Sequence, residues 1–295
     1  VGSEMCIRDR GCNGMAGHMI SLVLKEDGHE VIGFAREDLK IVDTIIGDAK
    51  KIGELQKIVL SGNYDAIVNC IGLLNKKANE YKADAVLLNS FLPHYLVDLT
   101  ENIHTRVIHI STDCVFSGAK GGYKEEDLCD GTTFYDKSKA LGEIDDKKNI
   151  TIRTSIVGPD IKSDGIGLFN WFMQVTGKIQ GYDKVYWTGQ TTLQLAKTIE
   201  AVLNDKNAVG LYNLVPSEKI SKYCLLKLFN KYMRNEEIEI VKNGNIESDK
   251  SLVRTKFDFE YKIPNYDDMV KELLLWMENH KELYSHYVQS MNWRK

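Results

Sequence analysis

Short apolar runs alternate with amphipathic helical patterns in the first half of this chain, and that alternation limits the fold more than any other feature. The expected strands cover residues 30–34, 41–48, 64–72, 107–110 and 149–159, the last running into a loop. The expected helices between them cover residues 15–25, 52–60 and 78–101. Strands and helices that alternate in this way form a parallel sheet with helices on both faces. We therefore predict an α/β fold with a Rossmann-type, doubly wound parallel sheet.

A GxxGxxG motif at residues 11–17 stands directly before the first expected helix. Such glycines allow a tight turn and let the backbone approach the pyrophosphate of a dinucleotide, whose phosphates face the N-terminal N–H groups of the helix. We predict that this loop binds a dinucleotide cofactor. The expected contacts are Gly11, Asn13, Gly14, Met15 and Gly17.

The ten residues before this motif do not resemble the strand that it should follow. A central parallel strand is a continuous apolar run, but Arg8, Asp9 and Arg10 precede the first glycine. Charged groups at the centre of a sheet are costly unless they are paired or exposed. We interpret residues 1–10 as a non-native segment that has replaced the first strand, which puts the activity of this particular chain in question.

The alternation weakens after residue 158, so we expect a second unit there. We predict a dinucleotide-binding Rossmann domain over residues 11–158, to which residues 188–212 return. Residues 159–295 would form mainly a smaller C-terminal α/β substrate-binding domain.

The choice of cofactor depends on the residue that follows the second expected strand. About 20 residues past the glycines, an acid binds the ribose hydroxyls of NAD, whereas an Arg accepts the 2′-phosphate of NADP. Arg36 stands at this position and favours NADPH, and Glu37 beside it leaves NADH as an alternative. The strand over 64–72 ends in a glycine that would bring the backbone close to the cofactor ribose. Its expected contacts are Cys70, Ile71 and Gly72.

Tyr135 and Lys139 lie four residues apart at the start of another helical pattern and would share one helix face. A free tyrosine titrates near ~10, and a neighbouring ammonium group lowers this value because it favours the phenolate. Thr112 follows the strand over 107–110 and could offer its hydroxyl to the same substrate oxygen. The three residues together predict a site that donates a proton near neutral pH.

This set, with its YxxxK spacing, resembles the short-chain dehydrogenase/reductase superfamily. The segments STDCVFSG (111–118) and YDKSKALGE (135–143) are most similar to the branch of dTDP-4-dehydrorhamnose reductase and its nucleotide-sugar relatives. The resemblance implies NAD(P)H-dependent reduction of a 4-keto group on a nucleotide-activated deoxysugar, in the synthesis of cell-surface polysaccharide precursors. Tyr135 would protonate the substrate oxygen, Thr112 would hydrogen-bond it, and Lys139 would lower the pKa of the tyrosine and hold the nicotinamide ribose.

The same resemblance implies further site residues. Asn89, which interrupts an apolar helical pattern, would support the active-site lysine through the backbone, and Asp48 would contact the adenine edge. The expected substrate contacts are Asp113, Cys114, Trp187 and Arg254. Two departures, Cys114 where the family has an aromatic residue and Asp136 where it has a small one, put the identity of the sugar in doubt more than the reaction.

Two other activities fit the same residues. A nucleotide-sugar epimerase or dehydratase retains NAD through its cycle, so an acid would be expected in place of Arg36, and a dehydratase needs an additional acid/base pair near Thr112. A non-catalytic, dinucleotide-binding regulatory subunit is the third alternative. The presence of Thr112, Tyr135 and Lys139 together argues against it.

Composition limits the partners. The net charge of −4 comes from interspersed charges, which does not suggest nucleic acid. The six cysteines form no CxxC pair and no Cys/His spacing typical of zinc, so we predict reduced thiols and no metal site. No apolar run approaches the ~18 residues that span a bilayer, and no secretory segment is recognisable. We expect a cytoplasmic protein with a nucleotide-sugar substrate and no membrane partner; a homodimer is compatible with the sequence.

Overall fold

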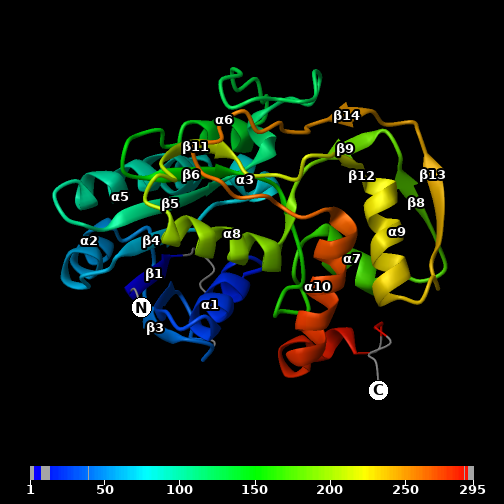
Figure 1. The fold of residues 1–295 in the computed structure, drawn as a ribbon, viewed down its shortest axis with the longest axis horizontal. Helices are drawn as coiled ribbons and strands as arrows, with labels where there is room; N and C mark the ends of the chain where they lie inside the picture. The colour runs from blue at the N-terminus through cyan, green and yellow to red at the C-terminus, as the bar shows by residue number, and fades with distance from the viewer. Residues whose placement is uncertain (1–2, 8–13, 39, 289, 292–295) are drawn as a thin grey trace.

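The computed structural model describes residues 3–7, 14–38, 40–288 and 290–291. Its centre is a seven-stranded sheet in which every neighbouring pair is parallel. In spatial order the strands are β11 (Gly210–Asn213), β6 (Ile150–Arg153), β5 (Arg106–Ser111), β4 (Ala66–Asn69), β1 (Ser3–Ile7), β2 (Glu30–Ala35) and β3 (Asp43–Ile46). The predicted doubly wound parallel sheet is therefore confirmed (Figure 1).

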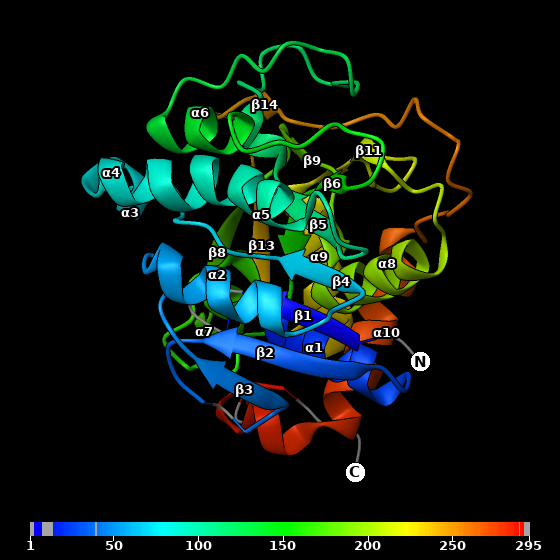
Figure 2. The same ribbon diagram turned by 90° about the vertical axis from the view of Figure 1, so that its left-hand side faces the viewer.

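Helices cover both faces of this sheet because successive side chains of each strand point to opposite faces. In β4, Ala66 and Val68 belong to one core and Ile67 to the other. The first face is covered by α1 (Gly17–Glu26) and α8 (Thr192–Asn204), and the second by α2 (Ile52–Ser61) and α5 (Leu92–Thr100). Figure 2 shows α2 and α5 on the side of the sheet that faces the viewer.

Ser3–Ile7 forms β1 between β2 and β4, and Met5 pairs with both Ile32 and Ile67. The prediction that no strand occupies this place is therefore wrong. The ladder is made by backbone groups, and the charged residues on which the prediction depended follow Ile7, in the range 8–13 outside the described residues. Whether residues 1–10 are native to the protein is a separate matter and stays a prediction.

The helix predicted over 78–101 is divided into four segments. These are α3 (Asn75–Glu80), α4 (Lys82–Ala85), the π-helical turn η2 (Val86–Phe91) and α5. A π-helical turn is rare and is frequently found at functional sites. Here it contains Asn89, the residue that interrupts the apolar pattern.

A second lobe lies beside the sheet (Figure 1). Its helices are α7 (Leu168–Gln174), α9 (Lys222–Met233), α10 (Tyr266–Asn279) and the 3₁₀ segment η4 (Lys281–Tyr287). Its short strands are β8 (Lys178–Tyr182), β9 (Val185–Trp187), β12 (Ile220–Ser221), β13 (Glu239–Asn243) and β14 (Ser248–Asp249). In addition, β7 (Ile156–Val157) pairs in parallel with β10 (Gln190–Thr191).

One hydrophobic core continues from the sheet into this lobe. It contains Met19 of α1 and Ile199 of α8 together with Phe172 of α7, Phe229 of α9 and Leu273 of α10. The division into two domains at residue 158 stays a prediction. In the part of the chain that the structure describes, no helix has the length and apolar character needed to cross a membrane.

Candidate active site

The candidate site lies at the carboxyl edge of the sheet, where β5 ends and α6 (Phe134–Ala140) begins. Thr112 caps the 3₁₀ turn η3 (Asp113–Val115), and its hydroxyl accepts a hydrogen bond from the Cys114 amide at 3.1 Å. Thr133 and Asp136 form a reciprocal capping box at the start of α6. Asp136 therefore has a structural role at the start of this helix.

The structure brings Tyr135 together with Thr112. The tyrosine ring is 6% exposed and packs in a small apolar cluster with Ala78 and Ala85. The Thr112 side chain lies close enough to the tyrosine hydroxyl to act on its pKa. The phenol and the threonine side chain are therefore neighbours at this edge of the sheet.

The expectation that Lys139 lowers the pKa of Tyr135 is wrong for this state of the protein. Burial raises the pKa of Tyr135, and the nearby Cys114 and Asp113 raise it further, while Thr112 offsets only part of this. The physical reason is that a phenolate loses its hydration when buried. The Lys139 side chain is meanwhile engaged elsewhere, so the phenol keeps its proton throughout the neutral range.

Lys139 lies one turn further along α6 and is 4% exposed. Its Nζ donates to the Ile110 carbonyl at 2.9 Å and lies 3.3 Å from Nε2 of His109. Burial lowers the pKa of Lys139 to about 8, although Glu143 and Cys70 act in the opposite direction. Sequence reasoning missed His109; the available signal was a polar residue inside the apolar run of β5.

Asn89 connects the loop after β4 to α6. Its side chain accepts from the Leu73 amide at 2.7 Å and donates to the Leu73 carbonyl at 3.0 Å and to Oγ of Ser138 at 2.9 Å. A side chain at Gly72 would lie 3.3 Å from Oδ1 of Asn89, so the absence of one leaves this connection undisturbed. The contact reaches the neighbour of Lys139, and a direct role of Asn89 in catalysis stays a prediction.

The predicted cofactor residues lie at the same edge of the sheet. Gly14, Met15 and Gly17 are at the start of α1, and the Gly14 carbonyl accepts from the His18 amide at 3.3 Å. The segment with Cys70, Ile71 and Gly72 directly follows β4, while Arg36 follows β2 and Asp48 follows β3. The strand order reverses between β1 and β4, and ligands of doubly wound sheets bind at this type of crevice. Gly11 and Asn13 lie outside the described residues.

The second lobe supplies a cation that the sequence did not reveal. Lys222 is the first residue of α9, and its Nζ lies 4.9 Å from the centre of the Trp187 ring. Burial raises the pKa of the Asp113 carboxyl, and Lys222 and Lys250 partly offset the rise. Lys222 therefore links two predicted substrate residues, Trp187 and Asp113. Burial also raises the pKa of Cys114 to about 12, so this thiol acts as a small neutral side chain beside Tyr135.

Arg254 does not join this group. Its guanidinium donates to the Lys256 carbonyl at 2.7 Å and to the carbonyls of Phe259 and Tyr261. It also lies 5.7 Å from the ring centre of Tyr212. Backbone carbonyls of the chain already use three of the donors of this residue, and a substrate contact of Arg254 stays a prediction.

The role of Arg254 can be tested by replacement with Ala. We expect a loss of about 1–3 kcal/mol in the free energy of unfolding, because carbonyls that now accept charge-assisted hydrogen bonds lose their donor. Chemical denaturation measures this change. An unchanged unfolding midpoint together with weaker nucleotide-sugar binding would return Arg254 to the substrate site.

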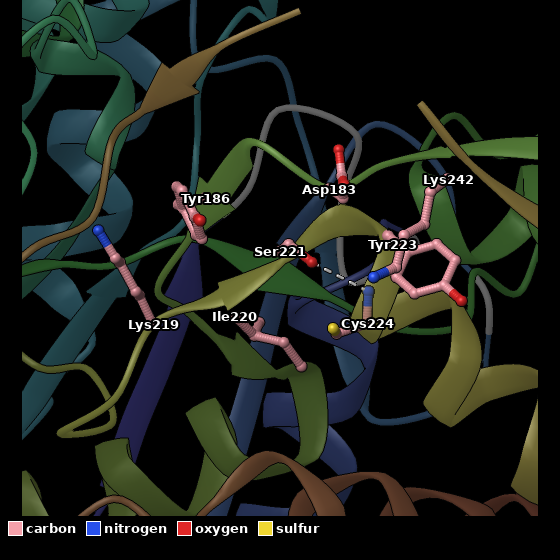
Figure 3. A pocket seen from close by; sticks show the side chains of 8 residues that line it. All are labelled: Asp183, Tyr186, Lys219, Ile220, Ser221, Tyr223, Cys224 and Lys242. Atoms are coloured by element: carbon pink, nitrogen blue, oxygen red, sulfur yellow. Dashed lines mark hydrogen bonds between the residues drawn. The ribbon is translucent and has the colours of Figure 1, made fainter. Parts of the chain in front are cut away.

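A separate hollow of about 320 Å³ opens on the second lobe (Figure 3). Lys219 and Lys242 stand at its wall, with Nζ 4.3 Å from the ring centre of Tyr186 and 5.3 Å from that of Tyr223, respectively. None of the residues predicted for the site lines it. Its lysines are therefore useful controls for Lys222.

A buried ion pair lies behind the site. Glu143 accepts from Nε and Nη2 of Arg153 at 2.9 and 2.6 Å and from Oγ of Ser111 at 2.7 Å. Both charged side chains are almost fully buried. The pair joins β5, β6 and the end of α6, so it holds the elements that carry Thr112 and Lys139.

The parallel sheet and its strand order define a Rossmann-type fold, the fold of the short-chain dehydrogenase/reductases. Solved structures share this fold. The chain superposes on a dTDP-4-dehydrorhamnose reductase from Bacillus anthracis in complex with NADP with a TM-score of 0.75 and 16% identity, covering 92% of this chain and 99% of that one. It superposes on a dTDP-glucose 4,6-dehydratase from the same organism in complex with NAD with a TM-score of 0.71 and 15% identity, covering 96% and 99%.

The chain belongs to the RmlD substrate binding domain family, whose model matches residues 5–250. This confirms the resemblance to the sugar-nucleotide reductase branch. A spore coat polysaccharide biosynthesis protein, SpsK, from Bacillus subtilis is 34% identical over 158 residues, 50% of this chain and 51% of that protein. A dTDP-4-dehydrorhamnose reductase from Aggregatibacter actinomycetemcomitans is 28% identical over 152 residues, 49% of each protein. The matched segments span about half the length of these curated relatives.

Proposed function

We propose that the protein is an NADPH-dependent reductase of the 4-keto group of a nucleotide-activated deoxysugar, acting in the synthesis of cell-surface polysaccharide precursors. The observation that supports this most directly is the position of Thr112 beside the buried Tyr135, close to the crevice at β1 and β4. Membership of a sugar-nucleotide reductase family supports the substrate class. Arg36 after β2 supports NADPH, with NADH as the alternative.

In this proposal the two hydroxyls bind the sugar carbonyl oxygen. The bound dinucleotide supplies the hydride that reduces the carbonyl carbon. Tyr135 donates its proton to the oxygen as negative charge develops there, and Thr112 donates a hydrogen bond to the same atom. The raised pKa of Tyr135 keeps the phenol in the protonated form that a proton donor needs.

The residues at the crevice are suited to a dinucleotide. Gly72 offers backbone without a side chain next to Asn89 and Lys139, where a ribose would lie. Lys139 has its Nζ at this point and would donate to the ribose hydroxyls. Gly14, Met15 and Gly17 would place the N–H groups at the start of α1 toward the pyrophosphate.

The assay follows the absorbance of NADPH with dTDP-4-dehydrorhamnose as the substrate. One NADPH consumed for each sugar reduced supports the proposal. Isomerisation of the sugar without net loss of NADPH would indicate an epimerase instead, and dinucleotide binding without any turnover would indicate a regulatory subunit.

Lys222 is expected to bind an anionic part of the substrate, because it brings a half-buried cation to the edge of the site near Asp113. Replacement of Lys222 by Ala should raise KM for the nucleotide sugar by about 10- to 100-fold, as expected for the loss of a charge-assisted hydrogen bond. The affinity for NADPH should not change. Steady-state kinetics and NADPH fluorescence measure the two quantities.

Lys242→Ala is the matched control, since Lys242 also lies over an aromatic ring but faces the hollow of Figure 3. Its KM should stay at the wild-type value. Equal KM values for the two variants and the wild type would remove Lys222 from the substrate site.

A further inference from the structure

Three buried polar side chains form a chain that ends at Lys139. Asn69 at the end of β4 has its Nδ2 3.1 Å from Nδ1 of His109, and Nε2 of the same imidazole lies 3.3 Å from Nζ of Lys139. Asn69 and His109 are fully buried. Water therefore does not contact these two side chains, and hydrogen bonds within the protein determine which of their atoms carry the hydrogens.

The hydrogen-bond donors in this chain determine its protonation. The Ile71 amide donates to Oδ1 of Asn69 at 3.0 Å, so the amide oxygen faces Ile71 and the NH₂ group faces His109. An NH₂ group only donates, so Nδ1 of His109 must accept. A neutral imidazole that accepts at Nδ1 carries its hydrogen on Nε2.

The Nε2–H group of His109 points at Nζ of Lys139, and this contact needs a lone pair on the lysine nitrogen. An ammonium group has three hydrogens and no lone pair, whereas a neutral amine can accept from His109 and still donate to the Ile110 carbonyl. The opposite orientation of Asn69 would set its NH₂ group against the Ile71 N–H group. The hydrogen bonds of all three side chains are satisfied when Lys139 is uncharged.

The charged and titratable groups around the chain agree with this assignment. Glu143 favours the ammonium form, but both of its oxygens are already bound by Arg153. Cys70 raises the pKa of Lys139, as Glu143 does, and His94 lowers the pKa of His109. Burial holds the pKa of His109 well below its usual range, so the imidazole stays neutral. Burial outweighs the other influences on Lys139 and lowers its pKa to about 8.

We propose that Asn69 and His109 stabilise the neutral amine form of Lys139 in the cofactor-free protein, and that at alkaline pH, where this form predominates, Lys139 takes up a proton when a dinucleotide binds. The ribose hydroxyls would offer acceptor oxygens in place of the His109 N–H group, and the proton would come from solvent. His109 is then a positioning residue that acts through Lys139. The second half of this proposal rests on the proposed function, whereas the first half concerns the free protein alone.

The free protein is tested by following the Lys139 ¹³Cε resonance during a pH titration, with Lys139→Arg used for assignment. We expect a midpoint near the value of about 8. The decisive variant is Asn69→Asp. Its carboxylate can accept from the Ile71 amide and also from Nδ1–H of His109, which moves the imidazole hydrogen to Nδ1 and leaves Nε2 free to accept from an ammonium group. The midpoint should rise by more than one pH unit, toward the ordinary lysine value of about 10.4.

Calorimetric titration with NADPH in two buffers of different ionisation enthalpy tests the second half. We take the Lys139 midpoint as about 8 in the free protein and about 10.4 in the NADPH complex. Near pH 9 the wild type should then take up about 0.9 proton per bound NADPH. Asn69→Asp should take up much less, because its Lys139 is already protonated in the free protein. NADPH binding without proton uptake, or an unchanged midpoint in Asn69→Asp, would overturn the proposal. Failure of NADPH to bind would overturn the proposed function, while the resonance titration would still decide the state of Lys139.

Discussion

Replacement of Tyr135 by Phe is expected to abolish almost all reduction of a 4-keto nucleotide sugar, lowering kcat by about 10²- to 10⁴-fold, the range for loss of a positioned proton donor. The ring would keep its place against Ala78 and Ala85, so the change removes one hydroxyl and little packing. The KM for the sugar should change less than kcat, because the lost interaction strengthens as the oxygen gains charge.

Single-turnover and steady-state absorbance at the NADPH band measure this effect. NADPH affinity, measured by fluorescence, should stay close to that of the wild type. Tyr95→Phe is the control, since Tyr95 stacks on the exposed Phe91 at 5.3 Å between ring centres, on a different helix from Tyr135. If Tyr135→Phe retained wild-type kcat, the proton would have to come from another group and the proposed mechanism would fail.

The largest loss of stability is expected for Glu143→Ala. The change leaves the Arg153 guanidinium buried without its counter-ion and takes the acceptor from Ser111. Breaking a buried pair in this way typically costs about 3–5 kcal/mol. Urea denaturation followed by far-UV circular dichroism measures the free energy of unfolding.

Glu80→Ala is the matched control, because it removes the carboxylate of an exposed pair whose atoms are 3.8 Å apart. Such a pair contributes about 0–1 kcal/mol. A loss below ~1 kcal/mol for Glu143→Ala would mean that water reaches Arg153 and that the pair does not hold the strands behind the site.

Local patterns predicted much of the fold. The strands at β2, β4, β5 and β6 and the helices α1 and α2 follow from apolar periodicity, which depends on a few neighbouring residues. The absence of β1 was predicted wrongly, because Arg8 to Arg10 were counted within the strand, although it ends at Ile7. The prediction of one continuous helix over 78–101 was also too simple. Asn89 forms hydrogen bonds to Leu73 and Ser138, and the chain around it forms a π-helical turn.

The site was predictable where its residues share one segment and not where distant segments meet. Thr112, Tyr135 and Lys139 come from a strand end and the next helix, so their spacing carried the information. Lys222 comes from a helix more than a hundred residues later and acts on the pKa of Asp113 through its charge, and no local sequence pattern reports such proximity. The same holds for Arg254, whose charge suggested a phosphate although its partners are backbone carbonyls that only the folded loop presents.

The hydrophobic core that is continuous between the sheet and the second lobe limits how the protein can be re-engineered. Phe229 of α9 and Leu273 of α10 are packed in the same apolar interior as Met19 and Ile199, which belong to the helices on the sheet. The segment that carries Lys222 is thus not an exchangeable module. Chimaeras that aim to change sugar preference by grafting this lobe from a relative would also have to transplant the matching faces of α1 and α8.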